Sequence, residues 1–579
     1  MEKKYYTNER NVQIVISLLK AHGIKKVIAS PGTTNMTFVG SIQQDPWFEI
    51  YSSVDERSAA YIACGMAAEA GEPVVLSCTG ATASRNYMPG LTEAYYRKLP
   101  ILAITSHRGD SSIGHLLDQQ IDRRQIPNDI AMESVTVPLV CSPKDEKYCL
   151  VEASKAILAL WHHGGGPAHI NLHTGYSKIF DVVDLPYTRV IRRHENFANV
   201  PTIPIDAKVA IFIGAHARMS NALQNAIDTF CESHNAYVIS DHTGGYNGKY
   251  RIPFALLGGQ MLYQSEYKQI DLLIHIGEVY GDGFGKDINP KQVWRVSEDG
   301  ALRDMFGRLT EVFEVEELDF FKYFTQTEVC NISAYQTYKK EYDIAVANVS
   351  ELPFGNIWIA KEVHDKLPHN SELHLGILNS LRSWNFFTID PTIDVYSNVG
   401  GFGIDGGVSS LIGASLVNPN KLYFGVVGDL AFFYDMNVLG NRHIGNNVRL
   451  LLVNNGKGNE FRMSMHPCSI FGDDADKYMA AAGHYGNKSS LLVKHYAEDL
   501  GYKYLTASNK EEFNHVMADF LNPQITQSIV LEVFTKMDDE REALDMMLRG
   551  LKMKKFVIKE NIKNSPLRPI VEKINKMLR

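Results

Sequence analysis

The sequence predicts an α/β protein made of three doubly wound domains with parallel sheets. Short apolar, β-rich runs alternate with helical patterns along most of the 579 residues. This alternation restarts after a Pro-containing connection near residues 185–205, and again near residue 354. Several of the runs end directly in a glycine turn that leads into a helical pattern, which is typical of βαβ units. We therefore expect domains at 1–185, 200–345 and 354–545, followed by a tail at 551–579.

The composition indicates a globular protein and excludes several classes. With 45% apolar and 21% charged residues, the chain suits three to four packed domains. The net charge of −8 gives no nucleic-acid signature, and no apolar run approaches the length of a membrane span. The first residues lack the apolar core of a signal peptide, and the seven scattered cysteines contain no CxxC pair. We expect a cytoplasmic protein that binds neither nucleic acid nor membrane.

The predicted first domain alternates helices and strands. Helical patterns cover 9–22 and the Ala-rich 58–70, and strand patterns cover 26–29, 48–54, 74–78 and 100–105. Strand 26–29 runs into Ser30-Pro31-Gly32, a turn signal. Glu56 lies between a strand and the start of a helix, where carboxylates are favoured, so on its own it is predicted to be a helix cap.

The predicted middle domain starts at Lys208 with a strand, a glycine turn and a helix, and further strands are expected at 271–276 and 292–296. The turn lacks a full GxGxxG, so the sequence favours a structural domain over a flavin or nicotinamide site. The tail carries nine lysines and arginines against two glutamates. It is interpreted as a solvated helix, with partner contact or covering of a site as the alternative.

The predicted third domain contains the most informative stretch, 422–458. An apolar strand at 422–427 is followed by Gly428-Asp429, a helix is expected around 435–444, and a second strand at 448–453 ends in Asn454-Asn455-Gly456. A last strand is expected at 528–533. A right-handed βαβ connection brings Asp429 and Asn455 to the same carboxyl edge of the sheet. Their carboxylate and amide oxygens suit Mg²⁺, although a strand-end Asp and an Asn-Asn-Gly turn are a sufficient structural interpretation.

This stretch resembles the cofactor-binding motif of the thiamine-diphosphate-dependent enzymes of the 2-oxo acid decarboxylase and carboligase family. The resemblance implies that Asp429, Asn455 and the backbone carbonyl of Lys457 hold the Mg²⁺ that binds the diphosphate of the cofactor. Gly428 and Leu430 flank the aspartate in the motif. Leu430 stands where the family often has Gly, a variant that also resembles the branch of the family serving menaquinone biosynthesis.

The resemblance also assigns a role to Glu56. In the family one first-domain glutamate contacts the aminopyrimidine nitrogen N1′ of thiamine diphosphate and relays a proton, a role for which a carboxyl group is suited. The first domain of one subunit faces the third domain of another in this family. The resemblance therefore implies a homodimer or homotetramer with active sites at the subunit interface.

Four further residues match family positions. Pro31 and Gly32 match a Pro-Gly near the pyrimidine ring, with a simple strand-to-helix turn as the alternative. Ile404 matches the bulky residue that wedges under the cofactor, but it also suits an ordinary strand or turn. Gln119 matches a glutamine at the reacting centre, and a polar surface helix is the alternative. Because Gln120 is adjacent, the matching residue could also be Gln120. Ser380 is a candidate for a diphosphate contact.

The pieces that resemble the menaquinone-pathway branch are EIYSSVDERSAAYIACGMA, TEAYYRKLPILAITSHR, GGPAHINL, NSLR, YSNVGGFGIDGG and GDLAFFYDMN. That branch decarboxylates a 2-oxo acid and transfers the resulting acyl anion equivalent to an acceptor. Two arginine positions differ, since this chain has Thr33-Thr34-Asn35 and Asn398-Val399-Gly400. Arg108 and Arg382 remain as candidates for binding a substrate carboxylate, or as ordinary surface or interdomain arginines.

We therefore expect a carboligase or transferase with an altered acceptor site and an unidentified acceptor. An aldehyde-releasing decarboxylase is the first alternative. A catalytically idle homologue that binds the cofactor is the second.

Overall fold

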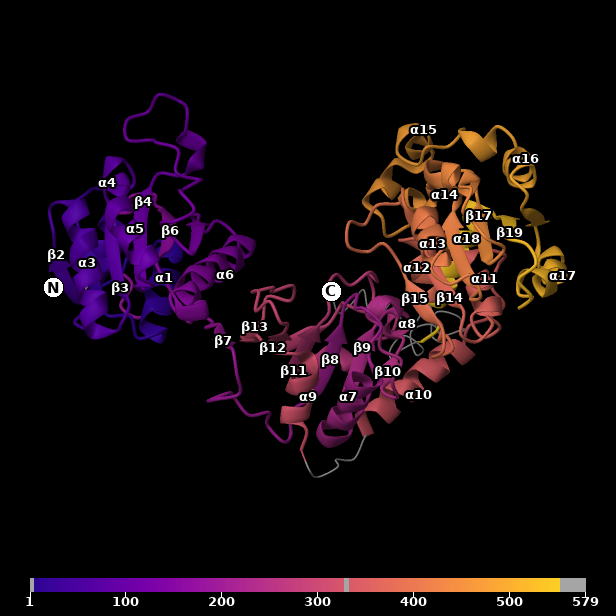
Figure 1. The fold of residues 1–579 in the computed structure, drawn as a ribbon, viewed down its shortest axis with the longest axis horizontal. Coiled ribbons are helices and arrows are strands. Elements are labelled where there is room, and N and C mark those ends of the chain that lie inside the picture. The colour runs from indigo at the N-terminus through magenta and orange to yellow at the C-terminus, as the bar shows by residue number, and fades with distance from the viewer. Residues whose placement is uncertain (1–4, 327–332, 552–579) are drawn as a thin grey trace, which may run out of the picture. The chain divides into compact units, whose positions relative to one another are not determined.

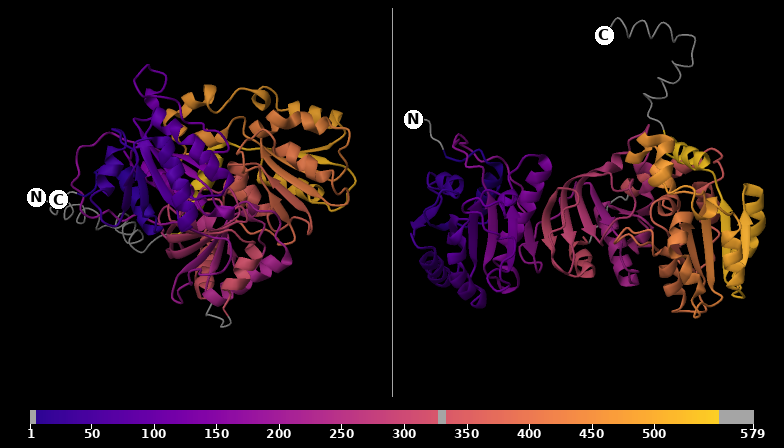
Figure 2. Two further views of the ribbon diagram at one scale, coloured as in Figure 1. Left: turned by 60° about the vertical axis from the view of Figure 1, so that its left-hand side comes forward. Right: turned by 90° about the horizontal axis from the view of Figure 1, so that it is seen from above.

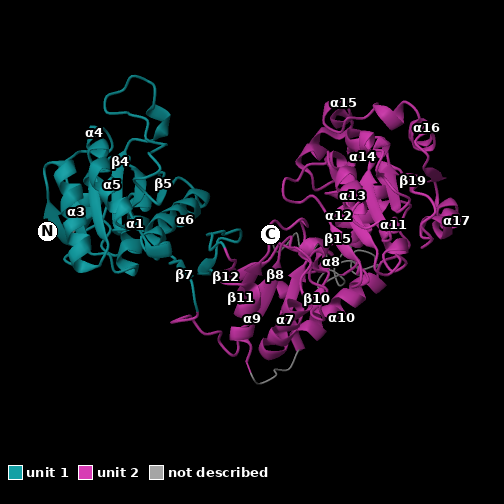
Figure 3. Cartoon of the chain, in the orientation of Figure 1, with its two compact units in different colours: residues 1–196, 299–314 teal, residues 197–298, 315–579 magenta. Residues whose placement is uncertain are grey.

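A computed structural model describes residues 5–326 and 333–551 (Figure 1). Apart from Leu551, the predicted basic tail lies outside the described residues. The chain forms two compact units, residues 1–196 with 299–314 and residues 197–298 with 315–579 (Figure 3). The predicted domain boundaries stay a prediction. Within the described part, no helix is long and apolar enough to cross a membrane.

The first unit contains a six-stranded parallel sheet with the order β2-β1-β3-β4-β6-β5. Its strands are β1 Lys26–Ala29, β2 Glu49–Ser52, β3 Val74–Thr79, β4 Ile101–His107, β5 Glu133–Val137 and β6 Ala168–His173. Its helices are α1 Arg10–Ala21, α2 Met36–Ile42, α3 Glu56–Ala70, α4 Thr82–Asn86, α5 Met88–Tyr96 and α6 Pro143–Ala159. Helix α1 packs on α6 and α3 packs on α5, so both faces of the sheet are covered.

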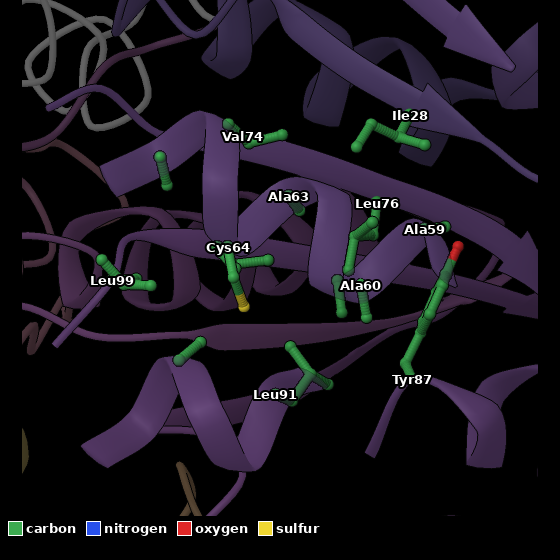
Figure 4. Close-up of a cluster of buried hydrophobic side chains, with 14 of the residues drawn as sticks. Ile28, Ala59, Ala60, Ala63, Cys64, Val74, Leu76, Tyr87, Leu91 and Leu99 are labelled. Atoms are coloured by element: carbon green, nitrogen blue, oxygen red, sulfur yellow. The ribbon is translucent and has the colours of Figure 1, made fainter. Parts of the chain in front are cut away.

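Small side chains set the close packing of α3, the helix that begins at Glu56. Ala59, Ala60 and Ala63 are fully buried against the sheet and α5 (Figure 4). Gly90 of α5 approaches so closely that a Cβ there would lie 2.4 Å from the Cβ of Ala60. The Ala-rich pattern and this glycine therefore fix the position of Glu56 relative to the sheet.

Two further strands of the first unit pair in parallel, β7 Arg192–His194 and β13 Leu309–Phe313.

In the second unit five parallel strands follow the order β10-β9-β8-β11-β12. These are β8 Val209–Ile213, β9 Tyr237–Ser240, β10 Arg251–Ile252, β11 Gln269–Ile276 and β12 Asn289–Val296, with α7 Asn221–His234, α8 Phe254–Gly258, α9 Glu317–Phe324 and α10 Ser333–Ala347. A Cβ on Gly214, after β8, would lie 1.9 Å from the carbonyl oxygen of Glu278, so backbone packing accounts for this glycine.

The second unit also contains a six-stranded parallel sheet with the order β15-β14-β16-β17-β19-β18. Its strands are β14 Glu372–Leu375, β15 Asp394–Tyr396, β16 Tyr423–Gly428, β17 Val448–Asn454, β18 Lys503–Ala507 and β19 Ile529–Phe534. Its helices are α11 Asn356–Val363, α12 Asn379–Trp384, α13 Gly407–Ser415, α14 Asp429–Asp435, α15 Ala475–Tyr478, α16 Leu492–Asp499, α17 Lys510–Phe520 and α18 Met537–Met547. Figure 2 shows the strands flanked by helices. The predicted α/β class with parallel sheets is confirmed.

One helix prediction in the third domain was wrong. We expected a helix around 435–444, but α14 starts directly at Asp429 and ends at Asp435. Phe432 and Phe433 are buried in a core cluster with α13 and α16, and this packing stabilises the earlier segment as helix. The later segment contains several asparagines and glycines, which are poor helix formers, and only a 3₁₀ turn covers Met436–Gly440.

Candidate functional site

A cavity in the second unit lies at the carboxyl ends of β14, β16 and β17. It brings together most of the candidates that sequence analysis took from this part of the chain, namely Ser380, Ile404, Gly428, Asp429, Leu430, Asn455 and Lys457. Arg382 does not line the cavity, although its partner Glu460 does. Strands β16 and β17 are parallel neighbours, with Gly428 opposite Val453. The predicted strand pairing is therefore observed, and it places Asp429 and Asn455 in the wall of one cavity.

Asp429 is the first residue of α14 and is 5% exposed. Its Oδ1 accepts a hydrogen bond from the backbone N–H of Leu430 at 2.8 Å, and its Oδ2 accepts one from Gly456 at 2.7 Å. Burial raises the pKa of this carboxyl to about 6. Because each oxygen uses one lone pair in these bonds, each can still accept a metal ion or another donor. A bound cation would compensate the buried negative charge.

The loop after β17 is held by a buried polar chain. Asn454 accepts from the N–H of Gly456 at 3.1 Å and donates to Glu532 at 2.7 Å. Gly456 has a φ of 80°, and a Cβ there would lie 1.8 Å from the Oδ1 of Asn487, so glycine is required. The Lys457 ammonium pairs with Asp476 at 2.7 Å. These contacts fix the turn that carries Asn455.

Several polar atoms in the cavity wall are buried and have no hydrogen-bond partner among the described residues. They are the Oδ1 of Asn356, the Oγ of Ser397 and both side-chain polar atoms of Asn459. Buried polar groups are normally paired, so this set suits a polar ligand in the cavity. Sequence analysis missed all three residues, because an isolated Asn or Ser carries no motif.

Ser380 lines the same cavity from α12, and Ile404 lines it from the loop before α13. Ile404 is partly exposed and lies three residues before α13. Asp435 accepts hydrogen bonds from the N–H and the hydroxyl of Ser409, which anchors the start of α13. Leu378, just before α12, lines the cavity with a φ of 64°, a left-handed conformation that is rare for a leucine. Such strain often marks functional sites.

Glu540 of α18 is a second acidic group in the cavity wall that sequence analysis missed. Its carboxylate accepts from the backbone N–H of Asn356 at 3.0 and 3.1 Å and from the hydroxyl of Thr535 at 2.9 Å. Burial raises its pKa to about 7. Its sequence context, Asp-Asp-Glu near a helix start, gives only the pattern of a solvated helix end.

The raised pKa of Glu540 predicts a pH-dependent stability of the protein without metal and cofactor. A carboxyl whose folded-state pKa is raised stabilises the fold below its unfolded pKa, and this contribution is lost as pH rises through the folded pKa. Between about pH 4.5 and pH 8 the loss amounts to about 3 kcal/mol. We expect the melting temperature of wild type to fall relative to Glu540→Gln over this range. Thermal scans at several pH values test this, with Glu542→Gln, exposed on the same helix, as control. A constant difference between wild type and Glu540→Gln would contradict it.

In the first unit, Glu56 is the first residue of α3 and is partly buried. The expectation that Glu56 itself caps the helix was wrong, because the cap is Asp55, whose side chain accepts from the N–H of Ser58 at 2.7 Å. The only hydrogen bond recorded for the Glu56 carboxylate within the described residues is a long one, from Asn86 at 3.3 Å. The Glu56 carboxylate therefore forms no strong hydrogen bond within the described residues and can bind another group.

Pro31 and Gly32 follow β1 and are exposed, at the same carboxyl edge as Glu56. A Cβ on Gly32 would lie 1.9 Å from a side-chain carbon of Thr79, so only glycine fits. Thr34 and Asn35, which replace the arginine-containing turn, are buried and bond to the backbone carbonyls of Ser106 and Ser30. Because Thr34 and Asn35 already form these internal hydrogen bonds, their side chains are not available to bind a substrate.

Gln119 lies in an exposed turn and has a φ of 58°. The alternative of a polar surface helix was therefore wrong. Gln120 is partly buried, and its Oε1 has no hydrogen-bond partner within the described residues. Glycine at 114 and the polar composition of this segment favour a turn over a helix.

The two candidate arginines differ in how firmly they are paired. Arg382 forms a two-pronged ion pair with Glu460 at 2.7 and 2.9 Å, and both side chains are 13% exposed. Arg108 donates its Nε–H to the hydroxyl of Tyr176 at 2.6 Å, but its terminal nitrogens reach Asp118 only at 3.4 Å. Asp118 is 77% exposed, so the terminal nitrogens of Arg108 are easily released.

The fold and this cavity define an α/β protein whose ligand site, at the carboxyl edge of a parallel sheet, combines an apolar lining with acidic and polar side chains. The family described as thiamine pyrophosphate enzyme, N-terminal TPP binding domain, matches residues 10–126. The 2-succinyl-5-enolpyruvyl-6-hydroxy-3-cyclohexene-1-carboxylate synthase of Bacteroides thetaiotaomicron is 30% identical over 566 residues, covering 95% of this chain and 100% of that protein. The enzyme of the same name from Bacteroides fragilis is 29% identical over 569 residues, covering 94% of this chain and 100% of that protein.

The chain therefore belongs to the family of thiamine-diphosphate-dependent enzymes, as the motifs predicted, and is similar over its length to these synthases. Among solved structures, the thiamine diphosphate-dependent 4-hydroxybenzoylformate decarboxylase of Rhodococcus jostii RHA1 aligns with a TM-score of 0.38 and 15% sequence identity. That alignment covers 91% of this chain and 99% of that chain.

Proposed function

We propose that this protein is a thiamine-diphosphate- and Mg²⁺-dependent enzyme that decarboxylates a 2-oxo acid and transfers the acyl anion equivalent to an acceptor. The observation that carries the proposal is the shared cavity of Asp429, Asn455 and Lys457 at two neighbouring strand ends. The similarity to synthases over the whole chain supports a transferase rather than an unrelated use of the fold.

The residues present fit a magnesium diphosphate group. Asp429, the side-chain oxygen of Asn455 and the backbone carbonyl of Lys457 would supply oxygen ligands, and Mg²⁺ prefers such ligands with phosphate oxygens completing its shell. The unpartnered polar atoms of Asn356, Ser397 and Asn459 offer further hydrogen bonds to a polar ligand. Thiamine diphosphate, when bound, supplies a nucleophilic carbon and an electron sink for decarboxylation.

In this proposal Glu56 would hold or release a proton toward the N1′ nitrogen of the cofactor, and Ile404 would contact the cofactor in the cavity. Glu56 belongs to the first unit and the cavity to the second, and we propose that they meet between subunits. Exposed apolar side chains near Glu56 support a subunit interface there, since Val54 is 80% exposed and Tyr61 and Ile62 of α3 are nearly half exposed. The edge position of β2 also suits association.

We propose that Arg108, rather than Arg382, binds a substrate carboxylate. Arg382 already holds a buried carboxylate of this chain, whereas Arg108 has two nitrogens with only weak contacts. Thr34 and Asn35 are occupied within the fold and cannot replace a guanidinium. With fewer cationic contacts than the synthases of the branch, the site is expected to take a different acceptor.

Replacing Arg108 with alanine is expected to raise KM for the 2-oxo acid by roughly 10- to 100-fold, with a smaller change in kcat. A hydrogen-bonded charge pair lost on truncation is worth about 1.5–3 kcal/mol, which sets this range. Steady-state kinetics measure the effect. Arg124→Ala removes a surface arginine that pairs with Asp122 and is the matched control. An unchanged KM in Arg108→Ala would remove Arg108 from the substrate site.

Product analysis tests the proposed reaction. Purified enzyme with thiamine diphosphate and Mg²⁺ is supplied with a panel of 2-oxo acids, with and without unsaturated and carbonyl acceptors. Loss of the 2-oxo acid with a ligated product supports the transferase. Loss of the 2-oxo acid with release of carbon dioxide and free aldehyde, and no ligated product across the acceptor panel, would instead establish a simple decarboxylase. Cofactor binding without any 2-oxo acid turnover would establish an idle homologue.

A further inference from the structure

An adjacent histidine pair, His162-His163, lies in a tight turn of the first unit outside the proposed active site. His163 has a φ of 50°, and Gly164 and Gly165 also have positive φ. This conformation is rare for a non-glycine residue. It places the two imidazoles next to each other, with ring centroids 3.9 Å apart and the ring planes tilted by 36°. A strained turn that points two potential metal ligands the same way suggests a function.

Two glutamates face this pair from the ends of neighbouring strands. β7 and β13 pair in parallel with His194 opposite Phe313, so Glu195 and Glu314 are the next residues on each strand. The backbone N–H of Glu314 donates to the carbonyl of His194 at 2.8 Å, which holds this register beyond the strands. The strand pairing therefore places the carboxylates of Glu195 and Glu314 next to each other, at the ends of β7 and β13.

The four side chains converge. The Nε2 of His162 lies 2.8 Å from Oε2 of Glu314, and the Nε2 of His163 lies 2.6 Å from Oε1 of the same carboxylate. Including a carboxylate oxygen of Glu195, the ligand atoms all lie within 4.8 Å of one another. The Glu314 side chain is 9% exposed and that of His163 65% exposed, so the group is anchored inside and open to solvent outside.

We propose that His162, His163, Glu195 and Glu314 form a binding site for a divalent transition-metal ion, with Zn²⁺ as the best match. Imidazole nitrogens and carboxylate oxygens are the ligands that Zn²⁺ takes in proteins. Ligand bonds of about 2.0–2.2 Å place neighbouring ligand atoms about 2.7–3.4 Å apart, depending on coordination number. The nitrogen–oxygen separations lie near the lower end of this range. An imidazole binds a metal ion through an unprotonated ring nitrogen, so each histidine would use Nε2 and carry its proton on Nδ1.

The local charge is compatible with a cation. Arg193 lies 3.8 Å from the Glu314 carboxylate and balances one negative charge, which leaves the second carboxylate and two neutral imidazoles. The ion would tie together the turn after α6, the end of β7 and the end of β13. It would thereby fasten residues 299–314 to the rest of the first unit, so we expect a structural role seen as thermal stabilisation.

Zinc titration of the untagged full-length protein tests the site. The protein is first stripped with chelator, then saturated with thiamine diphosphate and Mg²⁺ so that the cavity at Asp429 does not compete. We expect one Zn²⁺ per chain with a Kd of about 1 μM or below and a rise in melting temperature. Co²⁺ in place of Zn²⁺ should give a visible absorption spectrum with nitrogen and oxygen ligation.

Two variants separate metal binding from folding. Glu314→Gln and His163→Gln should weaken Zn²⁺ binding by at least about 100-fold, since loss of a direct ligand exceeds the effect of an outer contact. His163→Gln keeps an N–H donor toward Glu314 and so retains the structural contact. His115→Gln, at an exposed histidine of the same unit, should bind Zn²⁺ as wild type does. Failure of wild type to bind Zn²⁺ at about 0.1 mM, or equal affinity in His163→Gln, would overturn the proposal.

Discussion

Asp429→Ala is expected to lose Mg²⁺-dependent thiamine diphosphate binding by at least about 100-fold and to have no measurable turnover. The buried carboxylate is the one charged metal ligand in the proposed set, and it also accepts the backbone N–H of Gly456, which orients the loop carrying Asn455. Its removal therefore takes away both a ligand and the contact that positions a second ligand. Isothermal titration with thiamine diphosphate at fixed Mg²⁺ measures the loss.

Asp474→Ala is the matched control for this variant, because its side chain is 80% exposed. It should bind cofactor as wild type does. A circular dichroism spectrum and melting curve exclude unfolding of Asp429→Ala. We expect Asp429→Ala to stay folded without metal, since burial raises the pKa of Asp429 and makes its ionised form unfavourable without a cation. Cofactor binding by Asp429→Ala with wild-type affinity would refute the proposed metal site.

Glu56→Gln is expected to lower kcat by roughly 10²- to 10⁴-fold, the range for loss of a positioned proton-transfer group, while cofactor affinity changes little. Glutamine keeps the size of the side chain but cannot exchange the proton. The helix start should survive, because Asp55 and not Glu56 caps α3. Single-turnover kinetics with saturating cofactor, next to a binding titration, distinguish the two effects.

Two control variants separate the loss of proton transfer in Glu56→Gln from effects on the surrounding fold. Glu49→Gln alters an exposed glutamate on β2 and should leave kcat unchanged. Asp55→Ala should lower the stability of α3 and affect the chemistry less, since it removes the side chain that caps the helix. A Glu56→Gln enzyme with wild-type kcat would remove Glu56 from the proton relay.

The central strands of the sheets were predictable from the sequence because they are buried on both faces and give continuous apolar runs, whereas several edge strands, such as β15 and β18, were missed because they are short or partly exposed. Residues 26–29 match β1 without change, and the strands predicted at 422–427 and 448–453 are β16 and β17. The pairing of β16 with β17 followed from the handedness of βαβ connections, a rule of topology that needs no side-chain detail. The metal-ligand candidates were found because they lie at those strand ends.

The helix that follows β16 was misplaced because Gly428-Asp429 has the composition of a turn, while tertiary packing of Phe432 decided the outcome. The role of Asp55 as cap was missed because two acidic residues stand side by side at the helix start. Local sequence does not distinguish which of them turns back to the backbone.

The cavity wall was predictable only where a motif exists. Asn356 and Glu540 reach the wall from opposite ends of the predicted third domain, and Glu540 accepts the backbone N–H of Asn356. A contact between residues so distant in the chain leaves no local pattern. For the same reason the His162-His163 group was not predicted, since its partner Glu314 follows β13 and lies 152 positions after His162 in the chain.

The most direct test of the central claim, an active site shared between subunits, mixes the two inactive variants. Glu56→Gln and Asp429→Ala are denatured or co-expressed together so that mixed oligomers form, and their composition is checked by mass spectrometry. In a mixed dimer one site combines both intact residues, so random mixing should restore about one quarter of wild-type activity. Mixed oligomers without any restored activity would contradict a site built from Glu56 of one subunit and Asp429 of another.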